Sequence, residues 1–238
     1  MNIALVGYGR MGHEIEEMAL KMGHKVVVRI DVENQDDFTP VKLADANVII
    51  EFTTPDTAFR NIVKGLEMRI PVVSGTTGWL KHYDEVVKLC RKYETSFIHS
   101  SNFSIGVNIL FRINSELARL MAGQKEYRPA IEEIHHVKKL DAPSGTAIVL
   151  ADGIKAHHPY FEGWCNAENS KNNSIPITSV REGSVPGIHV VTWDSEIDTI
   201  TIRHESKGRK GLALGAIIAA EFIRTRRGVF TMADVLGF

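Results

Sequence analysis

The chain has 238 residues, of which 44% are hydrophobic and 24% are charged, and its formal net charge at pH 7 is −1. This balance gives no support to a nucleic-acid or membrane-surface role. No apolar run is long enough to cross a bilayer, the N-terminal one is too short for a secretion signal, and the two cysteines lack Cys-x-x-Cys spacing. We therefore expect a cytoplasmic protein with reduced thiols, whose length fits one large or two modest domains.

The amino terminus predicts a dinucleotide site. Asn2–Val6 is a short apolar strand, followed by Gly7-Tyr8-Gly9-Arg10-Met11-Gly12, which matches G-x-G-x-x-G, and by the helical stretch Glu14–Met22. A second strand, Lys25–Ile30, leads to the acidic Asp31. In this context the first glycine makes the turn, the second lets the backbone approach a pyrophosphate, and the third allows close packing. The carboxylate is suited to hold the ribose hydroxyls.

The residues around Asp31 favour NADH over NADPH. The carboxylate would repel a 2′-phosphate, and Val32 stands where an arginine would accommodate one. Arg10 and Arg29 still supply positive charge nearby, so we expect a preference for NADH rather than exclusion of NADPH.

Strands and helices alternate through the first hundred residues, which predicts an α/β fold with a Rossmann-like, doubly wound parallel sheet. The expected strands are Asn47–Phe52, Pro71–Ser74 and Phe97–His99, and the expected helices are Asp56–Met68 and Lys81–Tyr93. Each strand is followed by a polar loop: Thr53-Thr54, Gly75-Thr76-Thr77 and Ser100-Ser101-Asn102-Phe103. One such loop is most often ordinary turn chemistry, but three at the carboxyl ends of strands predict the wall of a cofactor cleft.

In the second half of the chain, strands and helices no longer alternate. A helix from Ile105 to about Met121 precedes four expected strands, Ala130–His136, Ile175–Val180, Ile188–Trp193 and Thr199–His204. This pattern predicts a second α+β domain with a mixed or largely antiparallel sheet. Glu162–Ser174 is the most loop-like stretch, and the apolar helix Gly211–Arg226 is expected to return to the first domain. We therefore expect a discontinuous dinucleotide-binding domain, 1–105 with 209–238, and a substrate-binding and oligomerisation domain, 106–208.

The segment Glu133–Ala147, E-I-H-H-V-K-K-L-D-A-P-S-G-T-A, contains several reactive side chains. It lies between an expected strand and an expected helix over Thr146–Ala156. Ser144 is a candidate N-cap, and the turn Ser144–Thr146 opens the helix, whose N–H groups and dipole bind anions. The adjacent histidines and lysines add protons and positive charge, which predicts capture of an acidic small molecule. The alternative is that the histidines lie at a solvated strand edge and that the lysines only make the surface more soluble. A plain surface loop would not, however, need this tight turn.

No metal site is expected. His157, His158 and Cys165 are the nearest approach to a ligand cluster, and their spacing matches no zinc pattern.

With these motifs the chain resembles the 4-hydroxy-tetrahydrodipicolinate reductase (dihydrodipicolinate reductase) family, nearly from end to end. The resemblance rests above all on H-H-x-x-K-x-D-A-P-S-G-T-A at His135–Ala147. Further matching segments are Gly7–Gly12, Gly75–Thr77, Ser101–Gly106, Arg181–His189 and His204–Arg209. The segment between Asp31 and Asn47 is short for the family, which usually has extra elements there.

The resemblance implies NAD(P)H-dependent reduction of a cyclic dicarboxylate, 4-hydroxy-tetrahydrodipicolinate, to tetrahydrodipicolinate in diaminopimelate and lysine biosynthesis. It implies that His135 is the general acid/base, that Lys139 is the proton donor, and that the enzyme is a homotetramer. The implied substrate-binding residues are His136, Ser144, Gly145 and Thr146. The implied cofactor contacts are Gly7, Tyr8, Gly9, Arg10, Met11, Asp31, Gly75, Thr76, Thr77, Ser100, Ser101, Asn102 and Phe103.

Two alternatives remain at this point. Another NAD(P)-dependent amino-acid dehydrogenase of the same two-domain plan, such as an aspartate dehydrogenase-like enzyme, would not need the His135–Ala147 arrangement. A catalytically silent NAD-binding regulator would be recognised by loss of His135 or Lys139, and both are present.

Overall fold

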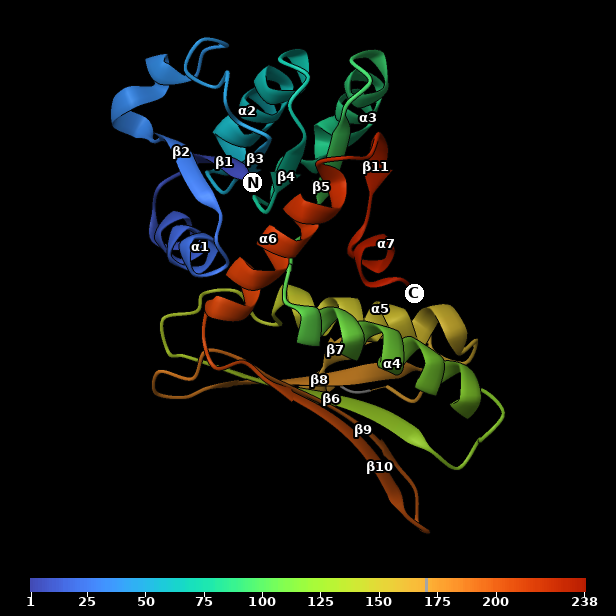
Figure 1. Ribbon diagram of the computed structural model, residues 1–238. Coiled ribbons are helices and arrows are strands. Elements are labelled where there is room, and N and C mark those ends of the chain that lie inside the picture. Colours follow the sequence, from blue (N-terminus) through green and yellow to red (C-terminus); the bar gives the residue numbers. More distant parts are fainter. Residues whose placement is uncertain (170) are drawn as a thin grey trace. The chain divides into compact units, whose positions relative to one another are not determined.

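The computed structural model describes residues 1–169 and 171–238, and the chain forms two compact units (Figure 1). One unit comprises Met1–Ile105 and Arg209–Phe238, and the other comprises Gly106–Gly208. Each unit has a sheet of its own, with six strands in the first and five in the second. Within the described residues, no helix is long and apolar enough to cross a membrane.

The first unit has a parallel sheet with the strand order β11-β5-β4-β3-β1-β2. The strands are β1 (Asn2–Val6), β2 (Lys25–Ile30), β3 (Val48–Glu51), β4 (Val72–Ser74), β5 (Ser96–His99) and β11 (Gly228–Phe230). The central strands are nearly continuous apolar runs because they are buried on both faces. The Rossmann-like, doubly wound sheet predicted from the sequence is confirmed.

Helices cover both faces of this sheet, as the alternation of side chains along β1 requires. Ile3 and Leu5 join the core beneath α1 (Arg10–Lys21) and α6 (Lys210–Ile223). Ala4 and Val6 join the core beneath α2 (Pro55–Glu67) and α3 (Tyr83–Lys92). Each fully buried large apolar side chain contributes about 1.5–3 kcal/mol. The unit also has helix α7 (Met232–Leu236) and the short 3₁₀ turns η1 (Val32–Asp37) and η2 (Leu80–His82).

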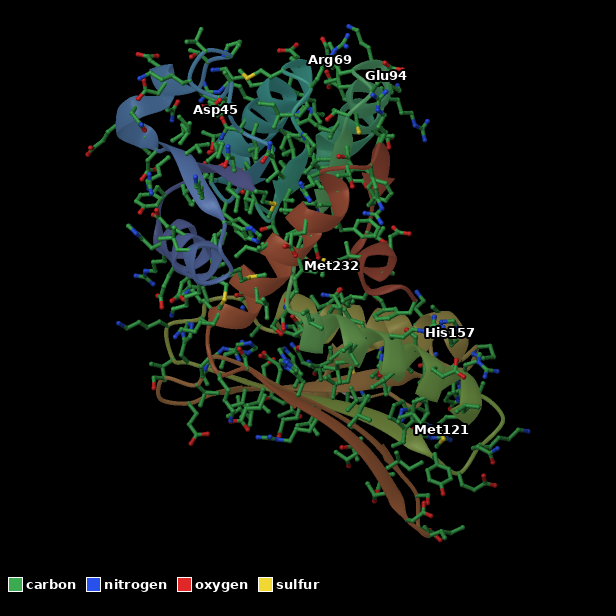
Figure 2. All side chains as sticks on the ribbon, viewed as in Figure 1. Asp45, Arg69, Glu94, Met121, His157 and Met232 are labelled. Atoms are coloured by element: carbon green, nitrogen blue, oxygen red, sulfur yellow. The ribbon has the colours of Figure 1, made fainter. Side chains whose placement is uncertain are left out.

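Two of these helices end without the usual glycine. Just beyond α2 and α3, Arg69 and Glu94 have φ values of 57° and 51°, in the left-handed region that favours glycine at a helix C-terminus. Figure 2 labels both residues.

The second unit has a mixed sheet with the strand order β10-β9-β6-β8-β7, which confirms the predicted fold class. Its strands are β6 (Arg128–His135), β7 (Gly163–Asn166), β8 (Ser174–Arg181), β9 (Ile188–Asp194) and β10 (Thr199–Glu205). The pairs β10–β9 and β9–β6 are antiparallel, whereas β6–β8 and β8–β7 are parallel. Helices α4 (Ile105–Met121) and α5 (Gly145–His157) lie along one face of this sheet (Figure 1) and bury Ile177, Val191 and Trp193.

Two local predictions need correction, and two small elements were missed. The expected loop Glu162–Ser174 contains β7, a short edge strand fixed by hydrogen bonds to β8 rather than by a strong pattern of its own. Helix α1 begins at Arg10, earlier than the expected Glu14, because Gly9 is its N-cap. The small elements β11 and α7 near the carboxyl terminus were not predicted.

Candidate active site

The glycine turn after β1 has two glycines that packing requires and one that it does not. Gly7 has φ +92°, and a Cβ there would lie 2.0 Å from the carbonyl oxygen of Phe52. A Cβ on Gly12 would lie 2.5 Å from the carbonyl oxygen of Gly7, whereas one on Gly9 would meet no described atom within 4 Å. Gly9 therefore leaves open space at the start of α1, as a backbone that receives a pyrophosphate must.

A cleft of about 240 Å³ lies beside this turn. Its lining includes Gly7, Gly9, Asp31 and Thr53. Asp31 is exposed, and it begins η1 by accepting the N–H of Val32 at 2.9 Å. One cleft therefore contains the glycine turn, the open end of the helix and the acidic residue. These residues fit a nicotinamide dinucleotide.

Beside the glycine turn, the positive charge of Arg29 is paired with a carboxylate. Its guanidinium forms an ion pair with Glu16, and the Tyr8 hydroxyl donates to the same carboxylate. Hydrogen bonding from Arg29 lowers the pKa of Glu16 in spite of partial burial. Arg10 is exposed, as Arg29 is.

A buried carboxylate that was not singled out from the sequence organises two of the predicted loops. Glu51, fully buried at the end of β3, accepts from the Thr53 N–H (3.0 Å), the Thr53 hydroxyl, the Ser74 hydroxyl (2.6 Å) and the Thr76 hydroxyl (2.8 Å). Burial raises the pKa of Glu51, although these hydrogen bonds act in the opposite direction. The only signal in the sequence was an acid at the end of an otherwise apolar strand.

The third predicted loop, Ser100–Phe103, follows β5 at the same edge of the sheet. The N–H of Ser100 donates to the Ser74 carbonyl at 3.2 Å, which ties this loop to the neighbouring strand β4. Phe103 is buried in the core, and a Cβ on Gly215 of α6 would lie 1.7 Å from its carbonyl oxygen. Ser101 and Thr77 are exposed, whereas Thr76 is buried. The three loops therefore follow three adjacent strands, β3, β4 and β5.

In the second unit, His135 is held by a buried carboxylate. His135 Nδ1 is hydrogen-bonded to Glu133, which lies two residues earlier on the same face of β6 and has no exposed surface. The other carboxylate oxygen of Glu133 accepts from Arg181 Nη2 at 2.9 Å. Burial alone would raise the pKa of Glu133, but hydrogen bonds from His135 and Arg181 outweigh it and lower the pKa to about 2.

The start of α5 is capped as predicted. The Ser144 hydroxyl accepts the N–H of Ala147 at 3.2 Å and is 3.1 Å from His189 Nε2. The His189 ring stands edge-on to that of His135, with 5.1 Å between the ring centroids. Burial, with the nearby His135, lowers the pKa of His189 to about 4. His135 and the N-terminus of α5 are thus joined through a buried histidine that is neutral at pH 7.

Lys139 has a close acidic partner that the sequence analysis did not assign. Its Nζ lies 2.8 Å from each carboxylate oxygen of Asp141. Arg181 donates to the Asp141 backbone carbonyl at 2.6 Å, so one guanidinium contacts both Glu133 and the Lys139 loop. His136 is half-buried and begins the turn that ends at Lys139, where the Lys139 N–H donates to the His136 carbonyl at 3.0 Å.

Ligand atoms of Glu133, His135 and His189 lie within 4.8 Å of one another, a spacing that a metal ion can use. Both oxygens of Glu133 are, however, already bonded to His135 and to the positive Arg181. Glu133 is therefore fully used by protein partners, and the absence of a metal remains a prediction.

Family models for the N-terminus and the C-terminus of dihydrodipicolinate reductase match residues 1–103 and 106–236. The chain belongs to the dihydrodipicolinate reductase family. It is similar to the 4-hydroxy-tetrahydrodipicolinate reductase of Christiangramia forsetii, with 48% identity over 99% of this chain and 98% of the relative. The enzyme of the same name from Thermosipho africanus is 32% identical, with the same coverage.

Solved structures agree on the fold. A dipicolinate-bound dihydrodipicolinate reductase from Paenisporosarcina sp. TG-14 has a TM-score of 0.78 at 23% identity, covering 98% of both chains. An amine dehydrogenase from Mycobacterium smegmatis has a TM-score of 0.63 at 10% identity, covering 98% of this chain and 95% of the other. The predicted dihydrodipicolinate reductase family and the reductase class are confirmed, and neither alternative is favoured.

Proposed function

We propose that this chain reduces 4-hydroxy-tetrahydrodipicolinate to tetrahydrodipicolinate with NAD(P)H, as a step of diaminopimelate and lysine biosynthesis. Membership of the family supports the reaction. The observation that best supports its assignment to particular residues is the contact of His189 with both Ser144 and the His135 ring. That contact links a proton-carrying histidine to a helix N-terminus suited to an anion.

The substrate carboxylates are assigned to the first turn of α5. The Ala147 N–H is used by the Ser144 cap, which leaves the N–H groups of Gly145 and Thr146 for a ligand, since first-turn donors have no intrahelical partner. A Cβ on Gly145 would meet no described atom within 4 Å, so this end of the helix is open. Ser144 shapes the turn, and His136 contributes a second contact. The related reductase that binds dipicolinate supports a dicarboxylate ligand.

The proton chemistry is assigned to His135 and Lys139. Loss of the 4-hydroxyl as water leaves a C=C bond conjugated with the imine. Bound NAD(P)H would supply a hydride to that bond, and the electron pair left on the substrate then takes up a proton. His135 Nδ1 is occupied by Glu133, so Nε2 is the nitrogen that exchanges protons. A Cβ on Gly187 would lie 2.9 Å from Nε2, so glycine there keeps this edge of the ring clear. Lys139 is assigned as the proton donor, and its ammonium group is hydrogen-bonded to the Asp141 carboxylate.

The first unit is assigned to the cofactor, with NADH preferred. The pyrophosphate would rest on the turn Gly7–Met11 and the ribose on Asp31, whose charge disfavours a 2′-phosphate. Because Arg29 is paired with Glu16, it is not free to compensate that charge. The loops Gly75–Thr77 and Ser100–Phe103 would contact the nicotinamide half, with Phe103 acting through its backbone because its side chain is buried.

The second unit is also assigned to oligomerisation, as part of a homotetramer. On the sheet face opposite the buried one, half-buried apolar side chains gather, including Ile134, Val180, Ile188 and Val190. No described helix of this unit covers that face. We assign this face to the contacts that join four copies. A cytoplasmic location suits an enzyme of amino-acid biosynthesis. A molar mass of one protomer by light scattering would contradict the tetramer.

The residue assignments are tested by steady-state kinetics of His135→Gln and Lys139→Met beside a matched control, Lys138→Met, whose side chain is exposed. Each of the first two variants should lower kcat by about 100-fold or more, a usual effect of removing a proton-transfer group. The control should stay within about twofold of the parent, since it removes a charge that has no assigned role. Equal effects of Lys138→Met and Lys139→Met would contradict the role of Lys139. Asp31→Ser should raise the ratio of NADPH to NADH activity.

A further inference from the structure

Glu133 and Arg181 lie on adjacent strands and form an ion pair in which Glu133 is buried and Arg181 is half-buried. In the β6–β8 register His135 is the partner of Arg181, and Glu133 precedes His135 on the same face of β6. Both carboxylate oxygens of Glu133 are bonded, one to His135 Nδ1 and one to Arg181 Nη2. All three side chains are therefore held by the sheet rather than by a loop.

This bonding selects one form of the histidine ring. A buried carboxylate accepts hydrogen bonds and donates none, so the neutral His135 ring carries its proton on Nδ1 and leaves a lone pair on Nε2. Rotation of the ring would leave the carboxylate oxygen without its donor in a buried site. Carboxylate partners of this kind fix the tautomer and orientation of functional histidines.

Arg181 extends the same network to the lysine. Its guanidinium also donates to the backbone carbonyl of Asp141 at 2.6 Å, and the Asp141 carboxylate holds Lys139 Nζ. Nη2 makes the bonds to both Glu133 and the Asp141 carbonyl, while Nη1 donates to the Val180 carbonyl at 2.8 Å. A lysine ammonium, a single nitrogen on a flexible stem, reproduces this planar set of three bonds poorly. One guanidinium thus connects the two proton-carrying residues.

We propose that Glu133 and Arg181 are positioning residues, Glu133 fixing the tautomer of His135 and Arg181 holding the Lys139 loop beside it. The inference rests on the proposed function for its kinetic consequence, but its geometric part stands without turnover. The charged and titratable groups around His135 are Glu133 on its own strand, Arg181 on β8, His189 on β9 with His204 beyond it on β10, and the Lys139–Asp141 pair.

The direct test is the ¹⁵N NMR spectrum of histidine-labelled protein near pH 7.5, with His135→Gln used to assign the ring signals. The parent should show His135 protonated on Nδ1. In Glu133→Gln the amide donates where the carboxylate accepted, so the signal should move toward the Nε2–H tautomer. A parent ring in the Nε2–H form, or a spectrum unchanged in Glu133→Gln, would overturn the role of Glu133.

Kinetics separate positioning from a purely structural role. Glu133→Gln should lower kcat by about 100-fold with KM within about threefold, and Glu133→Asp should recover part of the loss. Arg181→Met should lower kcat similarly, and Arg181→Lys should recover less than Glu133→Asp because an ammonium does not reproduce the three hydrogen bonds of the guanidinium. Glu182→Gln, an exposed neighbour, is the control and should match the parent. Kcat within threefold of the parent in both Glu133→Gln and Arg181→Met would refute the proposal.

Two further readouts keep the result interpretable. NADH affinity, which depends on the first unit, should be the same in all variants that fold. If Glu133→Gln does not fold, Glu133→Asp and the parent's NMR spectrum still decide the tautomer. Failure of the parent to consume the substrate would refute the proposed function, whereas an Nδ1–H ring that shifts in Glu133→Gln would still support the positioning geometry.

Discussion

Replacement of Gly9 by alanine should abolish tight cofactor binding while leaving the fold intact. Gly9 has φ −80° and ψ −155°, an extended conformation that alanine adopts, and its Cβ would meet no described atom within 4 Å. The matched variant Gly12→Ala places a Cβ 2.5 Å from the Gly7 carbonyl oxygen, where the backbone must shift. The two glycines of one motif are therefore expected to behave in opposite ways.

The magnitudes follow from these contacts. For Gly9→Ala, the poorer N-cap costs about 1 kcal/mol, and the more restricted unfolded chain returns about 0.4–1 kcal/mol. The free energy of unfolding should therefore change by less than about 1 kcal/mol. Gly12→Ala should lose about 1–3 kcal/mol through overpacking. A methyl group between α1 and a phosphate removes hydrogen bonds to a charged group, each worth about 1.5–3 kcal/mol, which is roughly 10- to 100-fold in Kd.

Urea unfolding and NADH fluorescence titration, performed on both variants and the parent, measure the two quantities independently. We expect the Gly9→Ala variant to be stable and to bind NADH weakly, and the Gly12→Ala variant to be clearly destabilised. Parental NADH affinity in Gly9→Ala would refute the assignment of this turn to the pyrophosphate.

Three further predictions concern stability. Ser144→Ala should cost about 1–2 kcal/mol in urea unfolding, because the Ala147 N–H loses its cap and His189 loses its partner; an unchanged midpoint would argue against this cap. For His189, an unfolded chain binds a proton below pH 6.5 that the folded chain does not accept until about pH 4. The parent should therefore lose stability as pH falls through that window, and His189→Gln should lack this component when midpoints are compared from pH 4 to 7. For Glu51, whose pKa is raised by burial, the folded state keeps the proton longer than the unfolded one, so Glu51→Gln should gain stability relative to the parent as pH rises above 4.5. A constant difference across that series would contradict the raised pKa.

The sequence predicted most of the first unit because its signals are local. Buried parallel strands are continuous apolar runs, and the bounds of β1 and β2 agree with the prediction to the residue. Helix α4 also has the predicted bounds, Ile105–Met121. Strand β7 was missed because Gly163–Asn166 has little β preference by itself, and its hydrogen bonds to β8 determine its conformation.

In the candidate site, too, residues that belong to a local motif could be predicted, whereas residues brought in from distant strands could not. His135, Lys139 and Ser144 became candidates from the sequence because they belong to one short motif. Arg181 lies 48 positions from Glu133 in the sequence, so no local pattern joins it to the site. Glu133 did carry a signal, since an acid two residues before His135 must share its strand face. Partners brought together by strand register become visible only when the sheet is assembled.

The central claim is that this chain transfers hydride from a nicotinamide cofactor to 4-hydroxy-tetrahydrodipicolinate. The most direct measurement is the rate of NADH and NADPH oxidation, with freshly formed substrate, followed by identification of the product by mass spectrometry. The account predicts substrate-dependent oxidation, faster with NADH, that yields tetrahydrodipicolinate in an amount equal to the cofactor consumed. Binding of NADH without any substrate-dependent oxidation would contradict it.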